Sequence, residues 1–359
     1  TELNEIAFGT NLLSIGSYAF DHCSSLTVVN LPDSLESTGS GVFQYCSNLK
    51  SASLGHALEN IGFKLFYSCS SLTDIVIPDR VTSIENLAFS QCPSLTNLVL
   101  STSVSSIGQS AFSHCTGLTD ISIPDTVMSL GSGIFSYCSG LTNAVISNGP
   151  TSIVDSMFEH CSSLAKITMG STIITIERNA FRNCTSLKSI TLPFGVTTIE
   201  EQAFIYCYNL ERVEIPDSVS SIGQLAFYSC RSLDDISLPF GLLTLDDYVF
   251  YGCANLTEIT IPETVTTVGR ETFRLCSGLK SISIPDSVFS IGYRAFNDCS
   301  SLTNFFIGSG LTSLGNWMFE NCDSLNSVVL SDNLIDLGSG AFSNCDNLTN
   351  ITIGANVSS

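Results

Sequence analysis

Residues 210–232 read LERVEIPDSVSSIGQLAFYSCRS, and this stretch contains one complete repeat of the chain. In its first part, the apolar residues Val213 and Ile215 alternate with polar ones, which is typical of a half-buried strand. Pro216-Asp217 then ends the strand, because proline cannot donate a hydrogen bond to a neighbouring strand and aspartate is common in turns. The repeat therefore begins with a short strand and a tight turn.

The second part of the repeat is apolar at Ile222, Ala226, Phe227 and Cys230. The step from Ile222 to Ala226 spans four residues and the step from Phe227 to Cys230 spans three, as on one face of a helix. We expect a short helical turn here rather than a second long strand.

Cysteine recurs every 23 residues from Cys23 to Cys345, with fifteen cysteines and no interruption. A phenylalanine stands three residues before each cysteine and a leucine three residues after it, and we call these positions the Phe-Cys-Leu ladder. Its members include Phe20, Cys23, Leu26, Phe204, Cys207, Leu210, Phe342, Cys345 and Leu348. An unbroken period of this length is typical of a solenoid, in which each repeat forms one coil that stacks on the next.

Stacking must supply the stability, because ordering one coil costs more than its own buried side chains return. We expect the strands of successive coils to pair in parallel. With Leu3–Phe8 as the first strand and Leu348–Ile353 as the last, the sequence predicts sixteen strands in one sheet.

The repeat pattern L-x-x-I-x-I-P-D-x-V-x-x-I-G-x-x-A-F-x-x-C resembles the BspA-like leucine-rich repeat, as residues 118–125 and 279–286 illustrate. The resemblance implies an α/β repeat solenoid, a curved right-handed coil. About 16 short parallel strands would line its concave face, with short helical or irregular turns on the convex face. Residues 1–359 would form a single domain of about 15 repeats, cut mid-repeat at both ends. The usual asparagine of leucine-rich repeats is missing, so we expect the Pro-Asp turn to replace it.

Neither end of the sequence carries a polar capping repeat, which solenoids normally need for solubility. Two explanations stay open. The chain is an excised or processed fragment, or its end strands pair with another copy of the chain.

Composition excludes several classes of function. The chain is 44% hydrophobic, which excludes a disordered chain, and its formal charge of −20 with only 13 basic residues disfavours nucleic-acid binding. No apolar run reaches the length needed to cross a membrane, so we expect no membrane insertion by this segment.

The residues that could carry chemistry have simpler explanations. One cysteine per coil does not form a zinc motif, and stacked cysteines point alongside rather than at one another, so we expect buried thiols rather than metal ligands or disulfides. His22, His114 and His160 share the position before the cysteine but lie at least two coils apart. The Asp residues of the turn are spaced too widely to chelate a cation, although weak calcium association stays open. We therefore predict no catalytic site, no metal and no cofactor.

One stretch departs from the repeat on its outer positions. Phenylalanine replaces the turn aspartate twice, and charged residues replace Thr, Ser and Asn on the strand face. The candidate partner-binding residues are Lys166, Lys188, Phe194, Glu211, Arg212, Glu214, Asp234, Asp235 and Phe240. Aromatic residues and arginine are enriched in interface cores. Five further tyrosines lie in the same stretch, and Phe289, Tyr293, Phe306 and Trp317 form a second, weaker aromatic group.

Members of the resembled family are typically surface or secreted proteins associated with adhesion. The resemblance and the outer residues together predict a non-enzymatic binding or adhesion protein at the cell surface or outside the cell. Its partner would be a protein or a glycan. The alternative is a structural protein that assembles end to end through its terminal repeats.

Overall fold

The computed structural model describes residues 2–357, which form two compact units. Unit 1 ends at Ile173 and unit 2 begins at Ile174. The single domain over residues 1–359 stays a prediction, and each unit is described by itself below.

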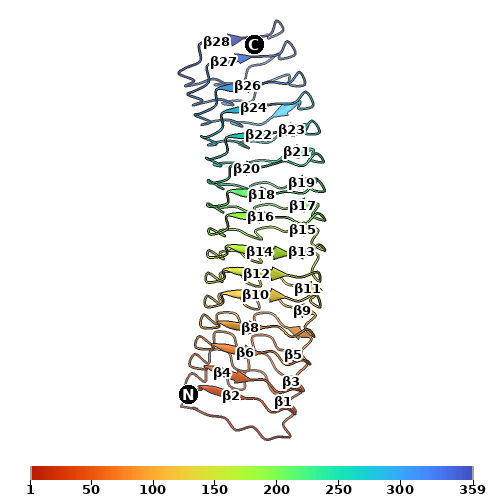
Figure 1. The fold of residues 1–359 in the computed structure, drawn as a ribbon. Coiled ribbons are helices and arrows are strands. Elements are labelled where there is room, and N and C mark those ends of the chain that lie inside the picture. The colour runs from red at the N-terminus through yellow and green to blue at the C-terminus, as the bar shows by residue number, and fades with distance from the viewer. Residues whose placement is uncertain (1, 358–359) are drawn as a thin grey trace. The chain divides into compact units, whose positions relative to one another are not determined.

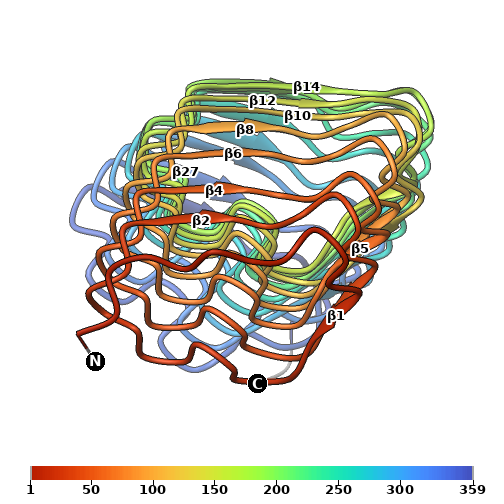
Figure 2. The ribbon, with the colours of Figure 1, turned by 90° about the horizontal axis from the view of Figure 1, so that it is seen from below.

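In unit 1, the predicted strands pair in parallel with the same residues of neighbouring coils, in two sheets that divide between residues 99 and 120. Val29 is buried while its neighbours Val28 and Asn30 are exposed, and Val28 pairs with Ser51 exactly one repeat later. This first row of strands comprises β2 (Val28–Asn30), β4 (Ser51–Ser53), β6 (Asp74–Val76), β8 (Asn97–Val99), β10 (Asp120–Ile123), β12 (Asn143–Ile146) and β14 (Lys166–Met169). Figures 1 and 2 show these strands running side by side in one direction.

A second row of two-residue strands follows the turn on another side of unit 1 (Figure 2). It comprises β1 (Ser14–Ile15), β3 (Ser37–Thr38), β5 (Asn60–Ile61), β7 (Ser83–Ile84), β9 (Ser106–Ile107), β11 (Ser129–Leu130) and β13 (Ser152–Ile153). Ser83 pairs in parallel with Ser106, so this row keeps the same register of one repeat.

Unit 2 repeats the arrangement. Its first row comprises β16 (Ser189–Thr191), β18 (Arg212–Glu214), β20 (Asp235–Ile236), β22 (Glu258–Thr260), β24 (Ser281–Ser283), β26 (Asn304–Phe306), β27 (Ser327–Val329) and β28 (Asn350–Thr352). Its second row comprises β15 (Thr175–Ile176), β17 (Thr198–Ile199), β19 (Ser221–Ile222), β21 (Thr244–Leu245), β23 (Thr267–Val268) and β25 (Ser290–Ile291). The predicted solenoid of parallel strands is confirmed, but the first-row strands of each unit are divided between two sheets and do not form the one sheet predicted.

Two local predictions need correction. No strand forms over residues 3–8, where the ring of Phe8 packs edge-on against Phe20 at 5.8 Å instead. The predicted first strand is therefore wrong, whereas the last one is confirmed by β28.

No helix forms anywhere in residues 2–357, so the second part of each coil carries the irregular turns and not the helical ones. The reason lies in Leu225 and Ser229, whose φ angles of 61° and 57° are in the left-handed region. A left-handed residue interrupts a right-handed helix. The amides of Ala226 and Cys230 therefore close separate turns onto Gly223 and Phe227, at 3.2 and 3.1 Å.

The core of each unit is a column of rings and thiols. The rings of Phe204 and Phe227 stack with centroids 5.3 Å apart and planes inclined by 2°. The Cys207 thiol donates a hydrogen bond to the carbonyl of Phe181 at 3.1 Å, so each sulfur reaches the coil before its own. Leu210 completes the buried set.

Ladder positions near the chain ends are less enclosed. Cys23 and Leu26 are buried, while Phe20 is partly exposed. Phe342, Cys345 and Leu348 are also partly exposed.

Side chains that bridge coils hold several of the turns that follow first-row strands, where the usual asparagine is missing. The Asp286 carboxylate accepts a hydrogen bond from the amide of Ser309 at 2.7 Å. The Ser218 hydroxyl contacts the carbonyls of Phe194 and Val196, at 2.7 and 2.6 Å. Asp286 therefore holds its turn to the following coil, and Ser218 holds its turn to the preceding coil.

Candidate functional site

Strand alternation places the predicted charged residues of unit 2 on the outer face of the first row. Val213 faces the core, so Arg212 and Glu214 on either side of it face outward. The Arg212 guanidinium lies 3.3 Å from the carboxylate of Asp235 on the next strand and 3.3 Å from that of Glu214. A longer ion pair of 3.9 Å joins Lys188 to Glu211. Arg212, Glu214 and Asp235 form one network on β18 and β20, and Lys188 and Glu211 form a separate pair.

Two predicted residues stand apart from this network. Lys166 lies exposed on β14 of unit 1, where it pairs in register with Asn143. Phe194 lies in the turn after β16 and is 94% exposed. The structure does not bring either of them to the hollow described next.

A hollow of about 800 Å³ lies over β20, β22 and β24 of unit 2, and we call it the strand-face groove. Its exposed aromatic residues are Phe240, in the turn after β20, and Phe306, on β26; they are 75% and 62% exposed. Its floor includes Ser237, Thr260 and Ser283. The acidic residues that line it are Asp217, Asp234, Asp235, Glu258 and Glu263.

The charged residues that line the groove are all acidic. Its lining contains five carboxylates and no lysine or arginine. Arg212 neutralises Asp235 from outside the lining. Within residues 2–357, no ion pair involves any of the other four carboxylates. The groove therefore presents negative charge beside exposed aromatic surface.

Sequence reasoning found Asp234, Asp235 and Phe240 but missed the second wall of the groove. Glu258 occupies the same repeat position as Asp235, one coil later, and could have been found from that spacing. Phe306 was assigned only to a weaker aromatic group, because its closeness to Phe240 depends on how the coils stack.

A second cluster in unit 2 combines tyrosine with arginine. The rings of Tyr228 and Tyr251 stack at 4.5 Å, and the Arg274 guanidinium lies 5.7 Å from the centre of the Tyr251 ring. Burial raises the pKa of Tyr228 to about 12. Arg274 also pairs with Glu271 at 2.9 Å and with Asp298 at 3.6 Å. Because its charges are satisfied internally, this cluster is a weaker candidate for a site than the groove.

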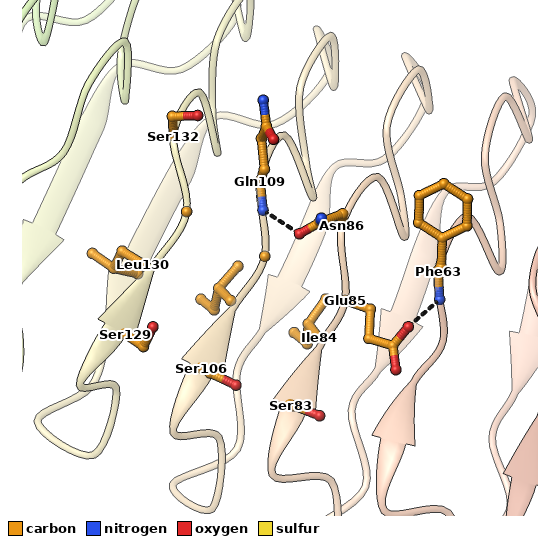
Figure 3. A pocket seen from close by; sticks show the side chains of 13 residues that line it. Phe63, Ser83, Ile84, Glu85, Asn86, Ser106, Gln109, Ser129, Leu130 and Ser132 are labelled. Carbon is orange, nitrogen blue, oxygen red and sulfur yellow. Dashed lines mark hydrogen bonds between the residues drawn. The ribbon is translucent and has the colours of Figure 1, made fainter.

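The polar hollow of unit 1, of about 620 Å³ and lying along β7, β9 and β11, is shown in Figure 3. Two of its polar side chains already bridge coils. The Glu85 carboxylate accepts a hydrogen bond from the Phe63 amide, and the Asn86 side chain accepts one from the Gln109 amide, both at 2.8 Å (Figure 3). These groups hold the coils together.

The titratable groups offer little reactive chemistry. Burial raises the pKa of the Cys115 and Cys207 thiols to about 12, which suppresses the thiolate needed by a nucleophile or a metal ligand. His114 and His160 flank the Tyr137 ring at 4.6 and 4.5 Å. In the described part of the chain, no three His, Cys, Asp or Glu residues are placed to hold a metal ion.

The chain matches one known protein family along its length. Residues 1–96, 59–184, 151–280 and 243–359 match the BspA type leucine-rich repeat region, so the matches together span the chain. The chain belongs to this family, whose members are leucine-rich repeat proteins that are generally non-catalytic and typically surface or secreted. A search of curated proteins found no match.

The fold agrees with that of one solved structure, and two others show weaker similarity. A leucine-rich repeat protein from Bacteroides ovatus is 27% identical with a TM-score of 0.81, over 95% of this chain and 88% of that one. A leucine-rich cell surface protein from Faecalibacterium prausnitzii is 24% identical with a TM-score of 0.47, over 97% and 85% of the two chains. A leucine-rich repeat protein from Eubacterium ventriosum is 21% identical with a TM-score of 0.46, over 83% of each chain. Among the described residues, no helix has the length and apolarity to cross a membrane.

Proposed function

We propose that this chain is a non-enzymatic binding or adhesion protein at the cell surface or outside the cell. It presents the outer face of its first strand row in unit 2 to a protein or glycan partner. The observation that carries the proposal is the strand-face groove, where four carboxylates without an ion pair lie beside the exposed rings of Phe240 and Phe306.

The composition of this surface supports the proposal. Aromatic residues and arginine concentrate the energy of protein interfaces, and Arg212 lies at the border of the groove. Loss of the exposed area of two phenylalanines on binding is favourable, because apolar surface leaves water. Lys188 and Phe194, also in unit 2, would extend the contact if a partner is large, whereas Lys166 belongs to unit 1 and stays a separate prediction.

The test compares the chain with two surface variants. Purified chain is immobilised and exposed to a surface-biotinylated host-cell extract and, separately, to a glycan array. One variant reverses three groove-side charges, Arg212→Glu, Glu214→Lys and Asp235→Lys. Its matched control is Asp120→Lys, at the repeat position of Asp235 but on β10 of unit 1.

We expect the wild type and the control to retain the same ligand and the triple variant to lose it. Retention of nothing by the wild type, or equal retention by all three, would count against the proposal.

The end-to-end alternative stays a prediction with its own measurement. Light scattering over a range of concentrations would support it if the particle mass grew with concentration. A constant monomer mass would exclude it.

A further inference from the structure

We infer that the strand-face groove takes a cationic, apolar protein segment, which sets lysine or arginine side chains against Asp234, Glu258 and Glu263 and an apolar side chain against Phe240 and Phe306. The inference rests on the proposed function and names the chemistry of the partner. It is carried by charge complementarity, by the exposure of the two rings and by the volume of the groove.

The negative charge of the groove favours the binding of a cation. Glu211 and Asp234 lie on neighbouring coils, with the Asp234 amide 3.1 Å from the Glu211 carbonyl. Asp235 and Glu258 are likewise one repeat apart, on neighbouring coils. Like charges on neighbouring coils repel, and ion pairs relieve only Glu211, through Lys188, and Asp235, through Arg212. A bound lysine or arginine would relieve the others, whereas a phosphate or a nucleic acid would meet repulsion.

The aromatic part of the groove calls for apolar contact in addition. Phe240 and Phe306 are 75% and 62% exposed, although both line the same hollow. A phenylalanine face attracts an aliphatic side chain through burial and a cation through its quadrupole. The volume of about 800 Å³ falls in the range of pockets that enclose small ligands, so a short extended segment fits it.

Unit 1 offers an internal contrast on the same strand face. Val76 and Val99 are exposed at the repeat position of Phe306, and Asp74 lies at the position of Glu258. Asp74, however, accepts hydrogen bonds from Thr73 and from Asn97, both at 2.8 Å, and these bonds lower its pKa. That carboxylate is already satisfied by its neighbours, unlike those of the groove.

The test uses the whole chain and three short labelled peptides. One alternates lysine with leucine, the second alternates glutamate with leucine, and the third alternates lysine with serine. Binding is measured by fluorescence anisotropy at low and at physiological salt. We expect the lysine-leucine peptide to bind most tightly, and its affinity to fall as salt screens the charges.

Paired variants locate the binding. The double variants Asp234→Asn/Glu258→Gln and Phe240→Ala/Phe306→Ala should each weaken the lysine-leucine peptide about tenfold, given the usual size of exposed ion pairs and of buried aromatic contacts. The matched controls are Asp120→Asn and Val99→Ala, at the repeat positions of Glu258 and Phe306 in unit 1. They should change the affinity less than twofold, by about the scatter of surface substitutions.

The inference falls if the glutamate-leucine or lysine-serine peptide binds as tightly, or if the groove variants behave as the controls do. It also falls if a host ligand is lost by the triple charge reversal but the lysine-leucine peptide does not compete for it. In that case the proposed function stands and only the chemistry of the partner is wrong. Conversely, peptide binding at the groove with no retained host ligand would contradict the proposed function alone.

Discussion

The buried thiols lead to a prediction about reactivity that can be worked out from their surroundings. The side chains of Cys115 and Cys207 are fully buried, and each thiol donates to a backbone carbonyl, that of Phe89 at 3.2 Å and that of Phe181 at 3.1 Å. Burial raises the pKa of both thiols to about 12, because the thiolate would lose its hydration. Cys345 is partly exposed to solvent, so its reactivity can be compared with that of the buried thiols in the same chain.

The expected protection is large. An ordinary thiol with a pKa of 9.0 is about one-tenth thiolate at pH 8, whereas a thiol with a pKa of about 12 is thiolate in roughly one molecule in 10,000. Ionisation alone therefore slows alkylation about a thousandfold, and exclusion of the reagent from the core slows it further.

The assay is alkylation with iodoacetamide at pH 8 in the folded state, followed by intact-mass measurement and peptide mapping. Cys345 should react first, and Cys115 and Cys207 only as the coils open. Denaturant without reductant should make all fifteen cysteines reactive. Alkylation of Cys115 or Cys207 in the folded chain at the rate of Cys345 would refute the buried-thiol interpretation. Unreactive cysteines in denaturant would refute it too, because they would indicate disulfides.

Three further predictions concern stability, each measured by urea or thermal unfolding. The buried protonated thiols contribute fully to stability below pH 9 and progressively less as the pH rises toward 12. At pH 10, the contribution of each thiol with a pKa of about 12 to the free energy of unfolding has fallen by about 1.4 kcal/mol. The urea midpoint should therefore fall steeply above pH 9, and an unchanged midpoint at pH 10 would contradict this. Gly252→Ala should cost about 1 kcal/mol, because Gly252 has a φ of 72°, whereas Gly16→Ala, with open space around its Cβ, should be close to neutral; equal costs would argue against backbone strain. Ser218→Ala removes contacts to two carbonyls and should lower the free energy of unfolding by about 1–2 kcal/mol. Ser220→Ala, whose hydroxyl contact is 3.5 Å, should lower it by only about a few tenths of a kcal/mol. A reversed order would exclude the bridging role of Ser218.

Much of the fold could be predicted because the apolar positions that recur in every repeat identify the buried residues. The period that places Phe204 and Cys207 in register requires the coils to stack, and alternation around Val213 identifies the strand and its inner face. The second row of strands could not be predicted in this way, because two residues such as Ser221–Ile222 are too few to reveal an alternation. The left-handed turn at Leu225 was also hidden, since leucine is not a residue that favours positive φ.

The candidate site was only half predictable, for a related reason. A departure from the repeat can be read from one sequence, and Phe240 was found because phenylalanine replaces the turn aspartate there. Whether two departures meet depends on the stacking and on side-chain exposure. In β26, Phe305 is 4% exposed and Phe306 is 62% exposed, although the two are adjacent in sequence. The groove therefore could not be predicted without the exposure of these side chains and the stacking of the coils that carry them.

The regular spacing that builds the core also decides where binding can evolve. Each outer position recurs on every coil, so residues of one position form a column with about 4.8 Å between neighbouring strands. A column of serine and threonine satisfies itself, as Thr142 does by donating to the Thr119 carbonyl at 3.0 Å. The column that holds Asp235 and then Glu258 has two like charges one repeat apart, and Arg212 pairs only with Asp235. Two like charges beside two exposed phenylalanines carry a cost in stability. That cost is the expected mark of a surface adapted to a partner that brings the missing positive charge.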